Sequence, residues 1–564
     1  MLDDSPSWQT HLPRQVQEPL LQFYSEEELQ HICRALARPP LTTSVRVNTM
    51  QTSREQLMHD LTAELRALVP GSKGAEPAWT GAETPYGTVE AHPLIADCVL
   101  IRPQNKAVNT VMPCGRELLV SRRCAEAVLR GAHVYIPGMV GCSPHCAAGD
   151  QVTVLCDVHD RFLRGSSTHI LSTRKLDPKR MKGCAMKKMG LDALSVRNKK
   201  NRHDRVHETL DEDPSKVDAV RAQFRGENER LDHRFGDLRH PSYGDKDPEQ
   251  APSLPDGIVV LGRGVMTVDK KEAFTSSDGV GCRMTQCVFR APPLNGMLAS
   301  RMYIQNLPSM VVPHVLDPQE GERVLDMCAS PGGKATHVAA LLKGSGQVIA
   351  LDRTEAKVGI IRQRASELGL PNIECFKADA TLLVARNDAA AAEWTSQAKD
   401  AEHKKKEGGK RGQRAGGRES AGGQAEGKEP FRLQEESFDR IVLDPPCTAL
   451  GLRPRLSVDV TAAEMARTHG YQRRMLHVAC ALLKPGGRLV YSTCTMNPLE
   501  NESNVAYAIR SLPLRLIAAE PRVGPPGRKG CGLTEEERQM VQRFEPDGEL
   551  DTNGFFIAAF QKIV

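Results

Sequence analysis

The chain has 564 residues, of which 40% are hydrophobic and 26% are charged. This length exceeds what one hydrophobic core supports, so it predicts two to four domains, and the composition excludes a chain that is disordered throughout. The formal charge of +5 is too small to predict nucleic-acid binding by itself. There is no run of 18 apolar residues, and the acidic, polar start lacks the apolar core of a signal peptide. We therefore expect a cytoplasmic protein with free thiols and no membrane contact.

The first 110 residues predict an N-terminal extension of mixed helix and strand. Ser25 is followed three residues later by Glu28 and lies before an apolar stripe, which is the capping-box pattern of a helix start. The run TTSVRVNTM at 42–50 is rich in β-branched residues and predicts a short strand. We expect residues 1–110 to precede a separate domain.

Residues 111–291 predict a small β-domain with a long polar insertion. Short apolar pieces separated by Gly and Pro, such as LLVSRRCAEAVLRGAHVYIPGMVG and GDQVTVLCDV, indicate a helix followed by short strands, as in a compact β-barrel. From about 163 to 252 the periodicity is lost, and residues 174–206 contain twelve Lys and Arg against three Asp. Such a block is typical of a disordered, solvated insertion.

Residues 292–564 alternate between strand-like and helix-like runs. RVLDMCAS, QVIALDR, IECFKADA, FDRIVLDPP and RLVYSTC indicate strands, and runs such as KVGIIRQRASELG and QRRMLHVACALLKPGG indicate helices between them. This order predicts an α/β domain whose parallel sheet has helices on both faces. A Gly-, Lys- and Glu-rich stretch at about 386–436 predicts a second, flexible insertion at the edge of this fold.

Four acidic residues follow the first four predicted strands of this domain: Asp326, Asp352, Asp379 and Asp444. In doubly wound sheets, ligands bind at the carboxyl ends of the strands. Each acid alone could be a helix cap, but four at successive strand ends favour a ligand site. The glycines within 330–334, SPGGK, would let the backbone approach the ligand, and the next helix offers free N–H groups. No G-x-G-x-x-G is present, which disfavours a dinucleotide.

Three motifs narrow the site to one family. DMCASPGGKATHVAALL, DPPC and STCTMNPLENE together resemble the Sun-domain family of RNA cytosine-5 methyltransferases, over roughly residues 295–564. The resemblance implies a Rossmann-like methyltransferase domain that uses S-adenosyl-L-methionine. The cysteine of DPPC agrees with it. DPPY or NPPY would indicate methylation of an exocyclic amine, whereas cysteine indicates covalent catalysis on a pyrimidine ring.

The resemblance also implies roles for individual side chains. Cys494 of the TC motif would add to carbon 6 of cytosine, and Cys447 of the PPC motif would act in the release of the product. Asp444 would bind the N3 and N4 edge of the base, with Lys334 near it. The opposite assignment of the two thiols stays open, since the PPC thiol attacks in the related DNA enzymes. The residues implied at the cofactor are Cys328, Ala329, Ser330, Pro331, Gly332, Gly333, Lys334, Asp352, Asp379 and Asp444.

The middle of the chain, from about 117 to 385, resembles the members of this family that carry a PUA domain, a small RNA-binding β-barrel. The resemblance implies a tRNA substrate, with the cytosine in the acceptor stem beside the CCA end, and some messenger RNAs. Arg130 and Tyr135 would contact this RNA, although Tyr135 could instead belong to the barrel core. The family's basic pair falls on Leu163 and Arg164, so only Arg164 keeps the charge.

Smaller features refine this resemblance. Thr448 and Ala449 replace the family's usual Ser-Gly after the PPC cysteine. The arginines of LGLRPRL, Arg453 and Arg455, could contact phosphate or lie on the surface. The strand with Arg46 resembles the family's RNA-proximal N-terminal strand, which implies that it packs beside the catalytic domain.

Other functions stay open. The chain could be a non-catalytic RNA-binding or ribosome-assembly factor, or a ribosomal RNA cytosine-5 methyltransferase. Cys142, His145 and Cys146 in GCSPHC could bind zinc, but no second cysteine pair is close in sequence, and we expect no metal. We expect a monomer.

Overall fold

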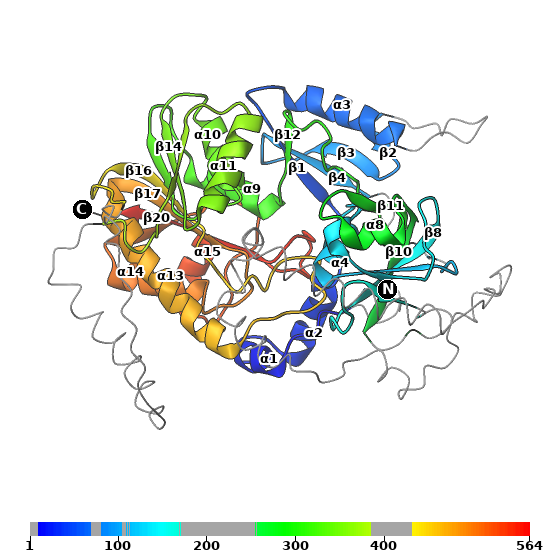
Figure 1. Ribbon diagram of the computed structural model, residues 1–564. Helices are drawn as coiled ribbons and strands as arrows, with labels where there is room; N and C mark the ends of the chain where they lie inside the picture. The colour runs from blue at the N-terminus through cyan, green and yellow to red at the C-terminus, as the bar shows by residue number, and fades with distance from the viewer. Residues whose placement is uncertain are drawn as a thin grey trace, which may run out of the picture.

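A computed structural model describes residues 9–68, 81–103, 109, 111, 113–168, 170, 254, 257–384 and 431–563. These residues are built around three β-sheets (Figure 1). The greater part of the two predicted insertions, about 163–252 and 386–436, lies outside the described residues. Among the helices of the described ranges, none combines the length and the apolar character needed to cross a bilayer.

The largest sheet has the strand order β15-β14-β13-β16-β17-β20-β18, with β19 paired to β20. The strands β13 to β17 run parallel to one another, whereas β20 pairs in antiparallel fashion with β17, β18 and β19. This confirms the predicted α/β architecture with a parallel sheet. The strands are β13 (Arg323–Asp326), β14 (Gln347–Asp352), β15 (Ile373–Lys377), β16 (Phe438–Leu443), β17 (Leu483–Thr493), β18 (Leu514–Ile517), β19 (Gln542–Phe544) and β20 (Phe555–Lys562).

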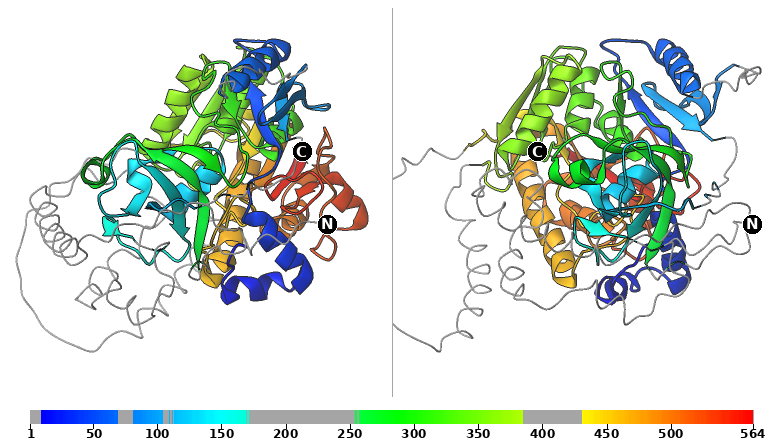
Figure 2. Two further views of the ribbon diagram at one scale, coloured as in Figure 1. Left: turned by 90° about the vertical axis from the view of Figure 1, so that its right-hand side faces the viewer. Right: turned by 45° about the vertical axis from the view of Figure 1, so that its right-hand side comes forward.

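Helices cover both faces of this sheet, because successive side chains of its buried strands point to opposite sides. Val324 packs in one core with α9, α10 and α11, whereas its neighbour Leu325 packs in the other with α13 and α14. Figures 1 and 2 show these two helical layers. The helices are α9 (Leu307–Leu316), α10 (Gly333–Leu341), α11 (Glu355–Glu367), α13 (Ala462–Leu482), α14 (Glu502–Ser511) and α15 (Glu535–Met540).

The N-terminal residues make two separate contacts with this domain. The helices α1 (Arg14–Leu20) and α2 (Glu26–Leu36) pack on the start of α13, where Leu20 and Ile32 meet Met465 in a common core (Figure 1). The capping box predicted at Ser25 is confirmed at the start of α2.

A five-stranded antiparallel sheet, ordered β12-β1-β4-β3-β2, forms the second contact and has α3 (Arg54–Ala67) on one face. Its last strand in the sequence, β12, directly precedes α9 of the large domain and pairs with β1 of the N-terminal residues. The sheet is therefore joined to the large domain by strand pairing as well as by packing. The strands are β1 (Thr43–Val47), β2 (Glu83–Thr84), β3 (Gly87–Ala91), β4 (Cys98–Arg102) and β12 (Met302–Ile304).

The third sheet has the order β6-β11-β10-β8-β5-β7-β9 and closes around its own apolar core with α4 (Arg122–Leu129) and α8 (Lys270–Thr275). A β-bulge bends β10 at Gly262, where a Cβ atom would lie only 2.0 Å from a neighbouring carbonyl oxygen. The strands are β5 (Glu117–Val120), β6 (Val134–Tyr135), β7 (Met139–Cys142), β8 (Gln151–Asp157), β9 (Ser166–Ser167), β10 (Ile258–Met266) and β11 (Val280–Cys287).

Helix α4 joins this small β-domain to the segment that follows Cys447. Arg122 forms two hydrogen bonds with Asp459, at 3.1 and 2.8 Å, and Glu126 accepts a hydrogen bond of 3.0 Å from the backbone of Leu456. The side chain of Leu456 is buried in the core of the small domain. The small domain is therefore anchored next to a loop that leaves the end of β16.

Candidate active site

A tight loop follows β13 and turns directly into α10. Gly332 adopts a φ of +101°, a left-handed conformation that favours glycine, and its N–H donates a hydrogen bond of 2.7 Å to Ala329. The loop lines a cavity of about 190 Å³ together with Tyr303, Gln305 and Asp444. Because the first turn of α10 has N–H groups without helical partners, this cavity is suited to a polar ligand.

The predicted acids at the next two strand ends have different surroundings. Asp352, at the end of β14, accepts a hydrogen bond of 3.3 Å from the backbone of Ser330, so it lies against the loop after β13. Asp379 accepts hydrogen bonds from the N–H and hydroxyl of Thr381, at 3.0 and 2.7 Å. One oxygen of Asp379 therefore has a local capping role, which was the alternative to ligand binding. Asp352 instead contacts the loop that lines the cavity.

Lys334 and Asp444 form an ion pair across the sheet end, with 2.7 Å between Nζ and Oδ2. The second oxygen of Asp444 accepts a hydrogen bond of 2.8 Å from the hydroxyl of Ser492. Burial opposes the charged form of Lys334, yet the carboxylate of Asp444 outweighs it and raises the pKa of the ammonium. Lys334 therefore remains a cation, held over the ring of Phe555 at 5.4 Å.

Asp326, the last residue of β13, is almost fully buried beside this pair. Burial raises the pKa of its carboxyl to about 7, although the charge of Lys334 opposes the shift. One oxygen accepts a hydrogen bond of 3.2 Å from Cys328, and the other has no partner among the described residues. This carboxyl is thus a buried acid with a free acceptor at the cavity wall.

The two predicted cysteines lie together at the ends of adjacent parallel strands, Cys447 after β16 and Cys494 after β17. Their Sγ atoms are 3.4 Å apart, and both side chains are half-buried. The hydrogen bond with Cys494, with burial added to it, raises the pKa of Cys447 well above that of an ordinary thiol. Either sulfur can be the donor of this hydrogen bond.

A buried carboxylate, Glu500, links the two loops that contain these thiols. It accepts hydrogen bonds from the backbone N–H and the hydroxyl of Thr448, and from Gln472 and Asn497 at 3.0 and 2.9 Å. The hydroxyl of Thr448 also meets that of Thr495, 2.8 Å away. Burial raises the pKa of Glu500, while these donors favour its charged form. Thr448 thus connects the PPC turn to the segment after Cys494.

The predicted RNA contacts lie on the small domain. Tyr135 is 48% exposed on the edge strand β6, and Arg130 is exposed at the end of α4. Arg164 is exposed, and its guanidinium donates to the carbonyl of Pro137 at 3.1 Å and to two carbonyls near α8 at 3.4 Å. Arg164 therefore also has a structural role in this domain.

The possible zinc ligands do not form a three-ligand group within the described ranges. A hydrogen bond with Cys142 lowers the pKa of Cys146, so these two thiols are close, but His145 has an exposed side chain. The one group of three potential ligands that the described residues contain is Asp97, His314 and His337, on the N-terminal sheet and on two helices of the large domain.

Sequence reasoning missed several residues that shape the site. Glu500 lies in the NPLENE run, where an acid among polar residues near a helix start is typical of a cap, and nothing local indicates burial. Tyr303 and Gln305 line the cavity, but they precede the α/β pattern and follow no strand of the large sheet. These residues reach the site through contacts with segments that are distant in sequence, which local patterns do not indicate.

Comparisons with known proteins agree with this geometry. A family model described as 16S rRNA methyltransferase RsmB/F matches residues 313–389 and 412–561. The chain is 32% identical to the tRNA (cytosine(72)-C(5))-methyltransferase NSUN6 of Mus musculus, over 95% of this chain and 90% of that protein. It is 30% identical to the rRNA (cytosine-C(5))-methyltransferase NOP2C of Arabidopsis thaliana, over 97% and 90%.

The fold is also shared with a solved structure. The crystal structure of NSun6 from Pyrococcus horikoshii with SFG superposes with a TM-score of 0.61 and 23% identity, covering 98% of both chains. At this identity the similarity shows a shared fold alone.

Proposed function

Because the chain belongs to the RsmB/F, or Sun-domain, family of S-adenosylmethionine-dependent RNA cytosine-5 methyltransferases, we propose that it methylates a cytosine of tRNA in the acceptor stem near the CCA end. The name of the mouse relative, which gives cytosine 72 of tRNA, supports this substrate. Some messenger RNAs are a second proposed substrate class.

The observation that supports the catalytic mechanism most directly is the 3.4 Å separation of the Cys447 and Cys494 thiols. Carbon 5 of cytosine is a poor nucleophile. Addition of the Cys494 thiolate to carbon 6 forms an S–C6 bond and an enamine, whose carbon 5 can accept the methyl group. Cys447, in its thiolate form, then takes the proton from carbon 5. The electron pair of that C–H bond re-forms the C5=C6 double bond, which breaks the S–C6 bond and expels the Cys494 thiolate. The methylated base leaves and Cys494 is free again.

The ion pair beside the thiols is suited to hold the target base. The Asp444 carboxyl would face the N3 and N4 edge of cytosine, where charge changes as the thiolate adds, and Ser492 and Lys334 hold this carboxyl in place. Lys334 would lie near the base, and Cys494 is among the charges that raise the pKa of the lysine.

The cofactor, S-adenosylmethionine, supplies an electrophilic methyl group on a sulfonium. Its site would be the loop 328–334, whose backbone turns at Gly332 against the cavity. Asp352 would accept hydrogen bonds from the ribose hydroxyls, and Asp379 would meet the adenine edge. The buried acceptor on Asp326 supports this location, because a cavity wall with an unpartnered carboxyl oxygen suits a ligand with N–H donors.

We propose that residues 111–291 form a PUA domain that binds the RNA, between an N-terminal extension, 1–110, and the catalytic domain, 292–564. Tyr135 and Arg130 would contact the RNA, since an exposed phenol can stack on a base and an arginine can reach phosphate. Arg164 would add charge near them.

Ribosomal RNA is a second candidate substrate, because the Arabidopsis relative with this name matches the chain over nearly its whole length. Bisulfite sequencing separates the candidates when small RNA, ribosomal RNA and messenger RNA are compared between cells with the wild-type protein and cells with Cys494→Ala. A Cys33→Ala variant, altered in α2, serves as the matched control.

The expected result is a protected cytosine near the CCA end of tRNA that is lost with Cys494→Ala and kept with Cys33→Ala. Protection in ribosomal RNA alone would move the proposal to that substrate. No protected cytosine in any RNA would refute catalysis and favour a non-catalytic RNA-binding factor.

A further inference from the structure

Two buried polar side chains of the N-terminal sheet reach α10, the helix that begins at the cavity loop. Arg46 of β1 is 2% exposed, and its guanidinium donates hydrogen bonds to the carbonyl of Gly333 at 2.5 Å and to the hydroxyl of Thr336 at 2.9 Å. A third bond of 2.9 Å goes to Gln305, which lines the cavity. The first turn of α10 is thus held by an arginine from a distant part of the sequence.

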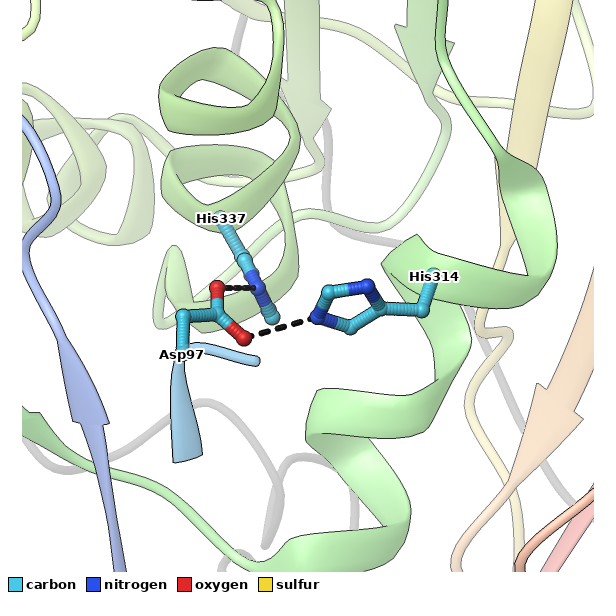
Figure 3. Close-up of side chains that lie close together, drawn as sticks. All are labelled: Asp97, His314 and His337. Carbon is cyan, nitrogen blue, oxygen red and sulfur yellow. Dashed lines mark hydrogen bonds and ion pairs between the residues drawn. The ribbon is translucent and has the colours of Figure 1, made fainter. Parts of the chain in front are cut away.

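Asp97, just before β4, forms the second contact and bridges two helices of the large domain (Figure 3). One carboxylate oxygen lies 2.6 Å from Nε2 of His337 on α10, and the other lies 2.7 Å from Nε2 of His314 on α9. The two imidazole rings meet edge to face, with 5.2 Å between their centroids. Figure 3 shows one oxygen of Asp97 directed at each ring.

This junction contains buried groups of opposite charge. Burial lowers the pKa of Arg46 to about 10, so the guanidinium stays charged. Burial also lowers the pKa of His337 to about 4, with Arg46 acting in the same direction, so that imidazole is neutral. Burial opposes the charged form of Asp97, but its two histidine partners hold the pKa of the carboxyl well below its usual range. One buried cation therefore faces one buried anion.

Asp97, His314 and His337 have the right donor types for a divalent cation, and their ligand atoms lie within 4.8 Å of one another. Two observations favour hydrogen bonds instead. Both Nε2 atoms already lie at hydrogen-bond distance from the carboxylate. A histidine that binds metal almost always donates its other N–H to an acceptor, whereas Nδ1 of His337 has no partner among the described residues.

The position of α10 matters for the site because its first two residues are Gly333 and Lys334. Gly333 lines the cavity, and Lys334 must reach Asp444 to form the 2.7 Å ion pair. We propose that Arg46 and Asp97 are positioning residues of the cofactor site, which act by holding the first turn of α10 against the N-terminal sheet. This inference rests on the proposed assignment of the loop 328–334 to the cofactor.

Binding of S-adenosylmethionine to full-length Arg46→Met and Asp97→Asn, measured by calorimetry, tests this inference. The matched control is Asn48→Ala. Asn48 is also buried at this junction, but its amide donates to the carbonyls of Ser300 and Leu368, at 2.8 and 2.9 Å, and not to α10. We expect Arg46→Met and Asp97→Asn each to raise the Kd for S-adenosylmethionine about 10-fold, which corresponds to loss of one or two such contacts.

The same two variants should leave the KM for RNA within about two-fold, because RNA binding is proposed on the small domain. Asn48→Ala should lower the Tm without raising the Kd. If Arg46→Met does not fold, Asp97→Asn and Arg46→Lys provide the same comparison, with Arg46→Lys intermediate because lysine lacks the planar fork of arginine.

Three outcomes would overturn the inference. The first is an equal rise in Kd for Asn48→Ala, which would indicate a general loss of stability. The second is a wild-type Kd for S-adenosylmethionine in both Arg46→Met and Asp97→Asn, together with weak binding by Asp352→Ala. This result would refute the positioning role but support the proposed cofactor site. The third is a rise in Tm on adding Zn²⁺ to the wild type but not to Asp97→Asn, which would identify a metal site. Failure of wild-type protein to bind S-adenosylmethionine would instead refute the proposed function.

Discussion

The Sγ atoms of Cys447 and Cys494 lie 3.4 Å apart at the ends of neighbouring parallel strands. A single base placed between the loops of β16 and β17 can therefore meet both thiols. The hydrogen bond with Cys494, with burial added to it, raises the pKa of Cys447, so the two thiols interact before any substrate arrives.

If Cys494 attacks and Cys447 releases, Cys447→Ala should accumulate a covalent complex with RNA. Without the residue that removes the proton from carbon 5, the S–C6 bond has no route to break. Cys494→Ala should form no complex. Denaturing gel electrophoresis of enzyme mixed with labelled tRNA and S-adenosylmethionine measures both.

The double variant Cys447→Ala/Cys494→Ala is the control, and its complex should also be absent. An adduct with Cys494→Ala and none with Cys447→Ala would reverse the assignment. Cys447 would then be the attacking thiol, like the PPC thiol of the related DNA enzymes.

The buried carboxylate of Glu500 should matter to both thiols through the loops that it joins. In Glu500→Gln, an amide N–H₂ would face donors from Thr448, Gln472 or Asn497, so at least one buried donor loses its acceptor. We expect a loss of about 1–3 kcal/mol in the free energy of unfolding. Because Thr448 follows Cys447 directly, we also expect kcat to fall about 10-fold or more in the protein that remains folded.

Glu502→Gln is the matched control for this prediction. Glu502 is equally buried, but its carboxylate accepts hydrogen bonds from Arg543 and from the backbone of Arg528, both at 2.8 Å, and not from Thr448. Arg543 also donates to the carbonyl of Met496, and the amide oxygen of the variant can still hold Arg543 in place. It should destabilise the fold, measured by urea unfolding, without lowering the kcat of the folded fraction. Equal losses of kcat in both variants would mean that Glu500 acts through stability alone.

Local patterns predicted the parts of the site that a single strand and its loop define. Asp326, Asp352, Asp379 and Asp444 each stand at or just after the end of a strand, and the parallel order of the strands brings these ends to one edge of the sheet. The turn at Gly332 is likewise a local feature, because it depends on the positive φ of that one residue.

The remaining contacts were not predictable because they join residues that are far apart in sequence. Arg46 reaches Gly333, and Asp97 reaches His337, and no periodicity tells which buried charges will meet. Arg453 shows the same limit. Its sequence context suggested a phosphate contact or an exposed charge, yet it is 5% exposed and bonds to backbone carbonyls of two distant segments.

The ion pair of Lys334 and Asp444 should be essential for turnover. Asp444→Asn removes the carboxylate that faces the base in the proposed mechanism and leaves the buried ammonium of Lys334 without its counter-ion. We expect kcat to fall by about 10²-fold or more. Methyl transfer from labelled S-adenosylmethionine to tRNA, at saturating levels of both, measures this effect.

Asp439→Asn provides the control on the same strand. Asp439 lies near the opposite end of β16 and pairs with Lys484 at 2.6 Å, so the variant loses an ion pair of similar geometry away from the site. Its kcat should stay within about two-fold of the wild type, since partly exposed pairs contribute little. A comparable loss in both variants would show that Asp444 is needed for the fold and not for the reaction.

The buried acid Asp326 should make the stability of the cofactor-free protein depend on pH. Its pKa is about 7 in the folded chain and close to its ordinary value of 3.8 when unfolded, so between these values the folded state binds the extra proton. The free energy of unfolding therefore falls as the pH rises through this window, by on the order of 1–3 kcal/mol between pH 5 and pH 8.

Asp326→Asn removes this proton and should therefore remove that part of the pH dependence. Relative to wild type, the Tm of the variant should rise between pH 5 and pH 8, as measured by calorimetry without cofactor. Asp439→Asn should show no such trend, because the pKa of Asp439 is lowered and the group is ionised throughout this range. The stabilised Asp326→Asn protein should bind S-adenosylmethionine more weakly if the free oxygen of Asp326 serves the ligand. A constant difference in Tm across this range would show that Asp326 does not titrate in the folded chain between pH 5 and pH 8.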